Sequence, residues 1–147
     1  MKRFFMIICL LHCIFNIEAA GYTTKQKRLR TEIFSFLEQK GYSPSEQTDG
    51  LKFKASGVTY YVEIDSTAIN PMYVRLRRYV KFGDSFKRLD VSKNINDYNK
   101  KLGVKVFCLD KSIVLSVEMF VTEAKYFTYA FESLLSQLQS SYKELTK

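Results

Sequence analysis

Tyrosine and arginine side chains alternate with apolar ones along the segment Met72–Phe82. Because successive side chains of a β-strand point to opposite faces of a sheet, the alternate polar residues are predicted to share one face. These residues are Tyr73, Arg75, Arg77, Tyr79 and Lys81. Tyrosine and arginine are enriched among the residues that contribute most to binding at protein interfaces. The pattern therefore predicts a binding surface and not a reaction centre.

The preceding segment, Val58–Asp65, alternates in the same way and places Tyr61 and Glu63 on the same predicted face. If a turn pairs the two segments, Glu63 lies opposite Arg75 and Tyr61 lies opposite Arg77. The alternative is a solvated face of ordinary cross-strand pairs, each contributing roughly 0.2–1 kcal/mol. Arg78 is the exception, because it falls on the apolar side; it either reaches the edge of the sheet or marks a local twist.

The single histidine and two of the three cysteines, residue types on which many catalytic and metal sites depend, lie near the N-terminus. His12 is the only histidine, and Cys9 and Cys13 lie close to it. Without residues 1–20, zinc sites built on histidine or several cysteines are excluded, as is catalysis by Ser-His-Asp or Cys-His. Phosphate-binding loops and dinucleotide motifs are absent. We expect no catalytic residue, no cofactor and no metal, and we expect Cys108 to be a buried apolar residue of a strand.

The N-terminal segment has the layout of a secretory signal peptide. Lys2 and Arg3 precede the apolar run Phe4–Phe15, and small residues follow it. This run is shorter than the ~20 residues that a membrane span needs, and nothing later in the chain replaces it. We therefore predict a signal peptide over residues 1–20, a single domain over 21–147, and a periplasmic or secreted location.

Three alternatives concern the fate of this segment. Cleavage after Ala19 or Gly21 would leave a mature N-terminus within Ala20–Tyr22, whereas cleavage after Ala20 would place Glu18 at the −3 position. Acylation of Cys13 would require a small residue before it, where this chain has a histidine. The last alternative is an uncleaved buried helix. Cleavage is the prediction that the residues favour.

The composition is basic, with a formal net charge of +8, and it includes 10 Tyr, 12 Phe and no Trp. A basic surplus attracts polyanions and anionic lipid, and it also keeps an exported protein soluble. Nucleic acid is not the expected partner, because no nucleic-acid motif is recognisable and because the export signal argues against a nucleic-acid ligand. One cysteine remains after cleavage, so the fold must be stabilised by packing without an intramolecular disulfide.

Glycines and hydrophobic periodicity divide the rest of the chain into elements. Thr23 or Thr24 is predicted to cap the first helix, Ser56-Gly57 to turn a hairpin, and Thr122 to cap the last helix. The predicted elements are a helix over Lys25–Lys40, a loop over Tyr42–Asp49, strands over Leu51–Ala55, Val58–Asp65, Met72–Phe82 and Phe86–Leu89, a short helix over Ser92–Leu102, strands over Val104–Leu109 and Ser112–Phe120, and a final long helix. A further turn is expected over Ser66–Pro71.

Strands joined mostly by tight turns form antiparallel sheets. We therefore predict an α+β fold in which helices pack on one face of an antiparallel sheet of about five to six strands. The last helix carries the strongest periodic signal, with Phe131 and Leu134 at the centre of an apolar stripe that should seal the inner face of the sheet.

This order of elements resembles the YbjN family, which has the type III secretion chaperone-like fold. The residues that carry the resemblance are Val117-Glu118-Met119-Phe120-Val121, the segment Asn94–Gly103 with Asn96 and Asn99, and the final helix with Phe127, Phe131, Leu134 and Leu138. The resemblance covers most of Thr24–Ser141. It implies a non-enzymatic protein-binding or regulatory module that is often dimeric.

The sequence thus predicts an exported, non-catalytic binding module that uses the open face of its sheet, with a protein partner or a second copy of the chain as the ligand. The alternative is a peripheral surface protein that binds anionic lipid or polyanion through its basic face. An enzyme with an unfamiliar site is a third, minor alternative.

Overall fold

The structure, a computed structural model, describes residues 21–83, 88–109 and 111–146, so the predicted signal peptide lies outside it. Its elements are α2 (Thr24–Gln39), β1 (Ser45–Gln47), β2 (Gly50–Ala55), β3 (Val58–Ile69), β4 (Met72–Lys81), α3 (Arg88–Leu102), β5 (Lys105–Leu109), β6 (Ser112–Val121) and α4 (Ala124–Leu145). The six strands form one antiparallel sheet in the order β1-β2-β3-β4-β6-β5. The predicted α+β class and the order of elements are confirmed.

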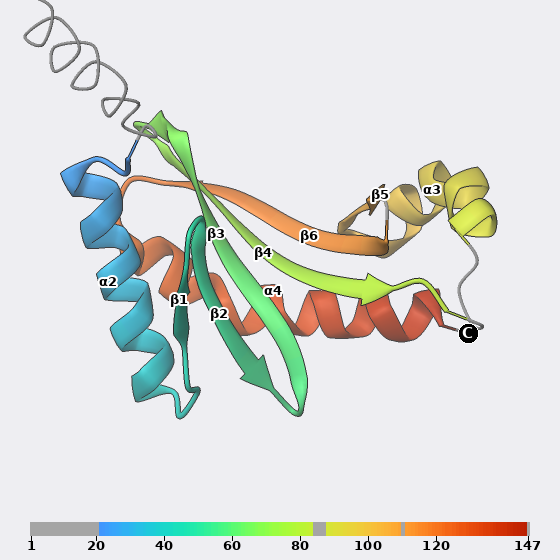
Figure 1. Cartoon of the computed structure of the whole chain (residues 1–147), viewed down its shortest axis with the longest axis horizontal. Coiled ribbons are helices and arrows are strands. Elements are labelled where there is room, and N and C mark those ends of the chain that lie inside the picture. Colours follow the sequence, from blue (N-terminus) through green and yellow to red (C-terminus); the bar gives the residue numbers. More distant parts are fainter. Residues whose placement is uncertain (1–20, 84–87, 110, 147) are drawn as a thin grey trace, which may run out of the picture.

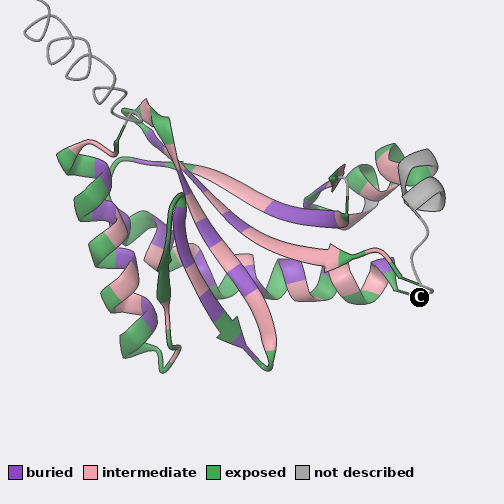
Figure 2. Ribbon diagram, viewed as in Figure 1, coloured by how far each residue is buried: buried purple, intermediate pink, exposed green. Residues whose placement is uncertain are grey.

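The sheet and its helices form two layers. In Figure 1 the strands lie in front of α4, so the viewer looks onto the face of the sheet that α2 and α4 leave open. Burial alternates along β2, β3 and β4, as Figure 2 shows, because every second side chain points into the layer of helices. We call these two sides the helical face and the open face.

The helical face centres on Phe131, which is fully buried in an aromatic cluster. Its ring lies 5.3 Å from that of Phe36, 5.7 Å from Phe53 and 5.8 Å from Tyr42. The periodicity of the last helix therefore identified the right face. Leu134, predicted to share the centre of this stripe, is only half-buried and packs against the rim of the core.

The start of α2 is joined to the sheet through one buried glutamine. Thr23 is the N-cap, and its hydroxyl and the Gln26 side chain form the two hydrogen bonds of a capping box. The same Gln26 amide donates to the carbonyl oxygens of Asp65 and Ala68, at 2.8 and 3.1 Å. Those carbonyls lie where the β3–β4 register shifts, so Gln26 satisfies backbone groups that the ladder leaves unpaired.

Two predicted loops contain strand. Residues 45–47 form the edge strand β1 instead of remaining a loop, because the chain turns tightly at Thr48-Asp49 and β1 pairs back on β2. Gly50 has φ of 153°, and a Cβ there would overlap the backbone oxygen of Val62. The predicted turn over Ser66–Pro71 is shorter than expected: β3 continues to Ile69, and the turn is Asn70-Pro71.

Two boundaries were also predicted wrongly. The expected strand Phe86–Leu89 is not formed at its second half, because Arg88 and Leu89 begin α3; Phe86 lies outside the described residues. The N-cap of α4 is Glu123 instead of Thr122, and its side chain makes no capping hydrogen bond. The long apolar stripe of α4 stabilises this helix by packing, so its start does not depend on a capping side chain.

The free edge of β5 is covered by α3. The Asn99 side chain donates to the Val106 carbonyl at 3.1 Å and accepts from the Val106 amide at 2.5 Å, as a neighbouring strand would. This pairing protects an edge that could otherwise pair with another chain. Cys108 lies opposite Ile113 as predicted, but it is half-buried instead of buried because β5 is the last strand of the sheet.

Candidate binding surface on the sheet

The structure brings the predicted site residues together on the open face. Tyr61 pairs with Arg77 and Glu63 pairs with Arg75 across β3 and β4, as predicted. The remaining predicted residues also lie on β4 and point to the same face; they are Tyr73, Tyr79 and Lys81. Lys81 lies at the exposed end of the strand.

Glu63 is the centre of this arrangement. One of its oxygens, Oε2, lies 2.5 Å from Arg77 Nη1 and 3.5 Å from Arg75 Nε. The other oxygen, Oε1, accepts a hydrogen bond of 2.6 Å from the Tyr79 hydroxyl. Arg75 also reaches the carboxylate of Asp65 at 3.6 Å. One carboxylate therefore positions two arginines and a tyrosine, and such charge-assisted bonds are stronger than neutral ones.

A second carboxylate, Glu118 on β6, belongs to the surface although it was not among the predicted site residues. Its oxygens accept hydrogen bonds from Tyr73 and from Ser116, the latter at 3.1 Å, and it pairs with Lys105 at 3.4 Å. Alternation along β6 assigns Glu118 to one face of the strand, and this signal could have marked it as a candidate. Its position opposite Arg75 follows from the pairing of β4 with β6. The pairing of β4 with β6 is not visible in the sequence, because α3 and β5 separate the two strands.

The pKa values of these groups follow their contacts. Hydrogen bonds from the hydroxyl and backbone N–H of Thr67 hold the pKa of Asp65 below its ordinary value. Burial acts to raise the pKa of Glu118, but the hydrogen bonds from Tyr73 and Ser116 and the Lys105 charge outweigh it and lower that pKa. Burial and the hydrogen bond to Glu63 raise the pKa of Tyr79. The carboxylates of Asp65 and Glu118 are thus held ionised, and the phenol of Tyr79 is held neutral.

The open face is more ordered than a solvated sheet surface. The side chains of Arg77 and Glu63 are only 15% and 16% exposed. Arg77 lies 5.3 Å from the centre of the Phe107 ring and donates to Ser116, which is itself buried although it points to this face. Figure 2 shows the corresponding buried stretch of β6. The alternative of a solvated face of ordinary exposed pairs is therefore not favoured for Arg75 and Arg77, because neighbouring side chains partly cover them.

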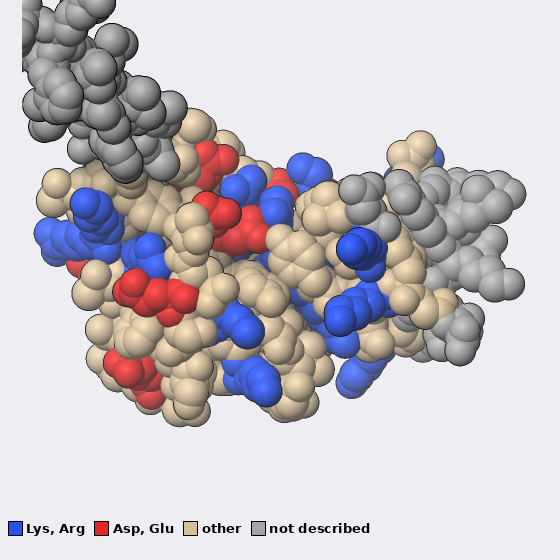
Figure 3. All heavy atoms as spheres, in the orientation of Figure 1, with Lys and Arg blue, Asp and Glu red and all other residues tan. Residues whose placement is uncertain are grey.

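One apolar group stands out from this network. Phe120 is 64% exposed and stacks on Tyr73 with ring centres 4.7 Å apart, while Arg75 lies over the same tyrosine ring. Tyr61 and Tyr79 form a second pair of rings at 5.1 Å. Figure 3 shows acidic side chains gathered near the centre of this face with basic side chains around them.

Arg78 lies on the helical face, which is the apolar side that the alternation predicts for it. Its guanidinium stacks on the Tyr142 ring of α4, 3.3 Å from the ring centre. Among the described residues, no carboxylate forms an ion pair with Arg78. A residue that broke the alternation is thus accommodated by a cation–π contact under the sheet.

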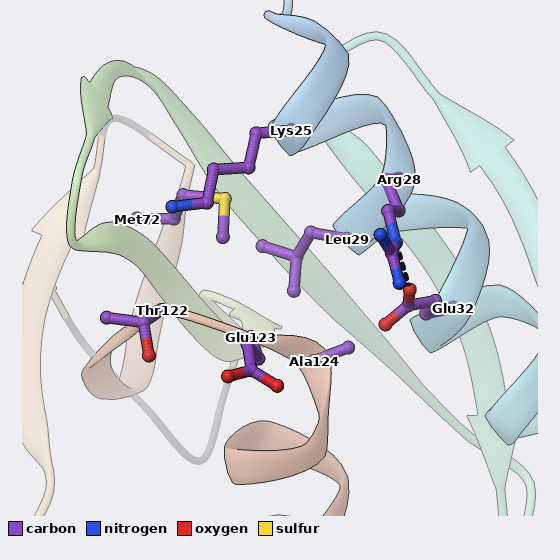
Figure 4. A pocket seen from close by; sticks show the side chains of 8 residues that line it. All are labelled: Lys25, Arg28, Leu29, Glu32, Met72, Thr122, Glu123 and Ala124. Atoms are coloured by element: carbon purple, nitrogen blue, oxygen red, sulfur yellow. Dashed lines mark hydrogen bonds and ion pairs between the residues drawn. The ribbon is translucent and has the colours of Figure 1, made fainter.

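A pocket of 240 Å³ lies between α2, β4 and the start of α4 (Figure 4). Leu29, Met72 and Ala124 supply its apolar part. Its charged residues oppose one another: Arg28 pairs with Glu32 at 2.6 Å, and Lys25 and Glu123 complete the set. Because two basic and two acidic side chains line the pocket, their formal charges balance and do not select a charged ligand.

Within the described ranges, no helix combines the length and the apolar character that crossing a membrane requires. No group of His, Cys, Asp and Glu side chains in them is arranged to hold a metal ion.

No protein-family model and no curated protein sequence matches the chain. Among solved structures, the chain is similar to the crystal structure of YbjN from E. coli, described as a candidate transcription regulator. The TM-score is 0.57 and the identity 17%, over 76% of this chain and 86% of that chain. The likeness shows that this chain has the fold of YbjN, and it confirms the resemblance at the level of fold.

Proposed function

We propose that the protein is an exported, non-catalytic module that binds a protein partner through the open face of its sheet. The observation that carries this proposal is the ordered network of tyrosines and arginines around Glu63 and Glu118. Side chains that are already held in one conformation lose little entropy on binding, so a contact with them is more favourable. The exposed Phe120 beside this network supplies the apolar anchor that protein interfaces need.

The charge distribution favours a protein over a polyanion. Arg75 and Arg77 both pair with Glu63, and Arg75 also pairs with Asp65, so carboxylates lie between and beside the arginines of this face. A polyanion would meet these carboxylates first, whereas a protein surface can place apolar and polar groups against both signs of charge. Anionic lipid or polymer is therefore an outcome of the test and not our proposal.

The proposal is tested by a photo-crosslinking amino acid placed at position 120 in the producing cell. We expect a covalent protein adduct, identified by mass spectrometry, because the Phe120 side chain projects from the proposed surface. Position 129 is the matched control, since Tyr129 on α4 is 95% exposed and lies outside the open face. The adduct at 120 should be lost when Arg75 and Arg77 are both replaced by Ser.

Salt and stability measurements make the result specific. Protein binding through this surface should persist between about 0.1 M and about 1 M salt, whereas polyanion binding should weaken steeply. The Arg75→Ser/Arg77→Ser variant is melted in parallel, since it leaves Glu63 without its arginines and is expected to lower the melting temperature. An adduct at 129 but not at 120, or binding that disappears with salt, contradicts the proposal.

Export is tested separately, by N-terminal sequencing of the protein recovered from the periplasm or the medium. We expect the mature chain to begin within Ala20–Tyr22, where small residues follow the apolar run. A soluble cytosolic protein with an intact Met1 would contradict export and leave the binding surface to be judged on the crosslinking result alone.

A further inference from the structure

A second pocket, of 320 Å³, lies on the helical face between the β2–β3 hairpin and the last turns of α4. Its volume is within the range of small-molecule sites. Ala55, Val58 and the ring of Tyr142 form much of its wall, and its polar groups come from Ser56, Tyr60, Arg78, Gln139 and Lys143. None of these lining residues is acidic, which distinguishes this pocket from the one between α2 and α4.

Tyr60 carries an unsatisfied group. The residue is fully buried, its ring stacks on Phe53 at 5.6 Å, and its hydroxyl has no hydrogen-bond partner among the described residues. A buried hydroxyl without a partner destabilises the folded protein. Phenylalanine would keep the ring contact without that cost. The hydroxyl is therefore a group whose partner is expected to come from outside the chain.

Arg78 supplies the charge. Its guanidinium carbon lies over the Tyr142 ring, 3.3 Å from the ring centre, and none of the described carboxylates pairs with it. Stacking uses the face of the guanidinium and leaves N–H groups at its edge free to bind an anion. Lys143 adds a second positive charge to the pocket wall. Cation, phenol and apolar wall are thus adjacent in one small cavity.

We propose that this pocket binds a small organic monoanion, a carboxylate attached to a compact apolar body. The carboxylate would pair with the edge of Arg78 and accept from the Tyr60 hydroxyl, and the apolar body would lie against Val58 and Tyr142. Guanidinium binds carboxylates in a planar two-bond geometry, which suits this ligand. The apolar wall disfavours a free inorganic dianion, because such an ion loses its hydration without enough donors to replace it.

Benzoate is the probe for the test, with benzyl alcohol, phenyl phosphate and inorganic phosphate as comparison ligands. Titrations followed by protein NMR should show saturable benzoate shifts at the hairpin turn and in the last turns of α4. Benzyl alcohol should bind at least about tenfold more weakly, since it lacks the charge. Inorganic phosphate should give no saturable shift in this pocket.

Two variants separate a binding role from a structural one. Arg78→Gln should weaken benzoate binding by about tenfold or more. Tyr60→Phe should raise the melting temperature of the free protein, because it removes the unpaired hydroxyl, and should weaken benzoate binding several-fold. Arg28→Gln is the matched control, because Arg28 lines the other pocket and should leave benzoate binding unchanged.

Several results would overturn the proposal. They are benzoate binding of wild-type strength in Tyr60→Phe, saturable shifts confined to residues outside the pocket, and preferential binding of inorganic phosphate. A Tyr60→Phe variant that is less stable than the wild type and binds benzoate equally well would also overturn it, by showing that the hydroxyl has a structural partner. If Arg78→Gln fails to fold, the Tyr60→Phe result decides.

Discussion

The two faces of the sheet hold their arginines differently, although the residues concerned are neighbours on β4. On the open face, Arg77 and Arg75 lie 2.5 and 3.5 Å from Glu63. On the helical face, Arg78 stacks on Tyr142, and no described carboxylate pairs with it. On one face the charge is compensated within the fold, and on the other it is held in place by an aromatic ring.

This difference separates two uses of a charged side chain. The arginines of the open face order a surface, and losing one partner leaves the others partly buried without compensation. Arg78 lies over the Tyr142 ring, and no carboxylate of the described residues pairs with it, so its hydrogen-bonding edge is proposed to be available to a ligand. The following predictions test how far the open face behaves as a structural unit when compared with the core beneath it.

The largest effect is expected on the helical face, at Phe131. Its replacement by Ala should lower the free energy of unfolding by about 3–5 kcal/mol, because the ring is fully buried and contacts several aromatic side chains. Chemical denaturation measures this value. A loss below about 1 kcal/mol would mean that α4 does not pack on the sheet as described.

A smaller loss is expected on the open face from Glu63→Gln. The change removes the negative charge that Arg75, Arg77 and Tyr79 share, and we expect a loss of about 1–3 kcal/mol. Glu123→Gln is the control, because its pair with Lys125 is exposed on both sides and should contribute less than about 1 kcal/mol. Equal losses in the two variants would show that the open face is an ordinary solvated surface.

Two tyrosines of one ring pair offer a finer test. Tyr79→Phe should cost about 1 kcal/mol, because its hydroxyl donates to Glu63 at 2.6 Å. Tyr61→Phe keeps the same ring contact and should change stability by less than about 0.5 kcal/mol. Both values come from denaturation curves measured in parallel. A larger loss of stability in Tyr61→Phe than in Tyr79→Phe would contradict a stabilising role for the hydrogen bond from Tyr79 to Glu63.

The smallest effect is expected in the stability of the folded protein at acid pH. The pKa values of Asp65 and Glu118 are lowered in the folded protein from ordinary values of 3.8 and 4.5. Their stabilisation is therefore fully present above these ordinary values and is lost as the pH falls through the lowered ones. Glu118→Gln should flatten the decline of stability below about pH 4.5 relative to the wild type. An unchanged acid profile would show that the Glu118 contacts do not favour its ionised form.

The sequence predicted the pairing of Tyr61 with Arg77 and of Glu63 with Arg75 because both depend only on strand alternation and a nearby turn. The burial of Phe131 followed in the same way from helical periodicity. Local patterns of this kind involve residues close in the chain, where the backbone repeat decides which side chains share a face. Boundaries were less predictable: β1 and the start of α3 depend on pairing and packing with distant segments.

The amino-acid sequence alone determined the α+β class, the face on which the residues of β3 and β4 lie and the cross-strand partners between these two strands. Only the tertiary structure decided that Glu118 joins the surface, that Arg78 lies over Tyr142 and that the hydroxyl of Tyr60 has no partner within the described part of the chain. These contacts join segments that are far apart in the chain. Their geometry depends on how the helices and the sheet pack, and alternation along one strand carries no information about the packing of another.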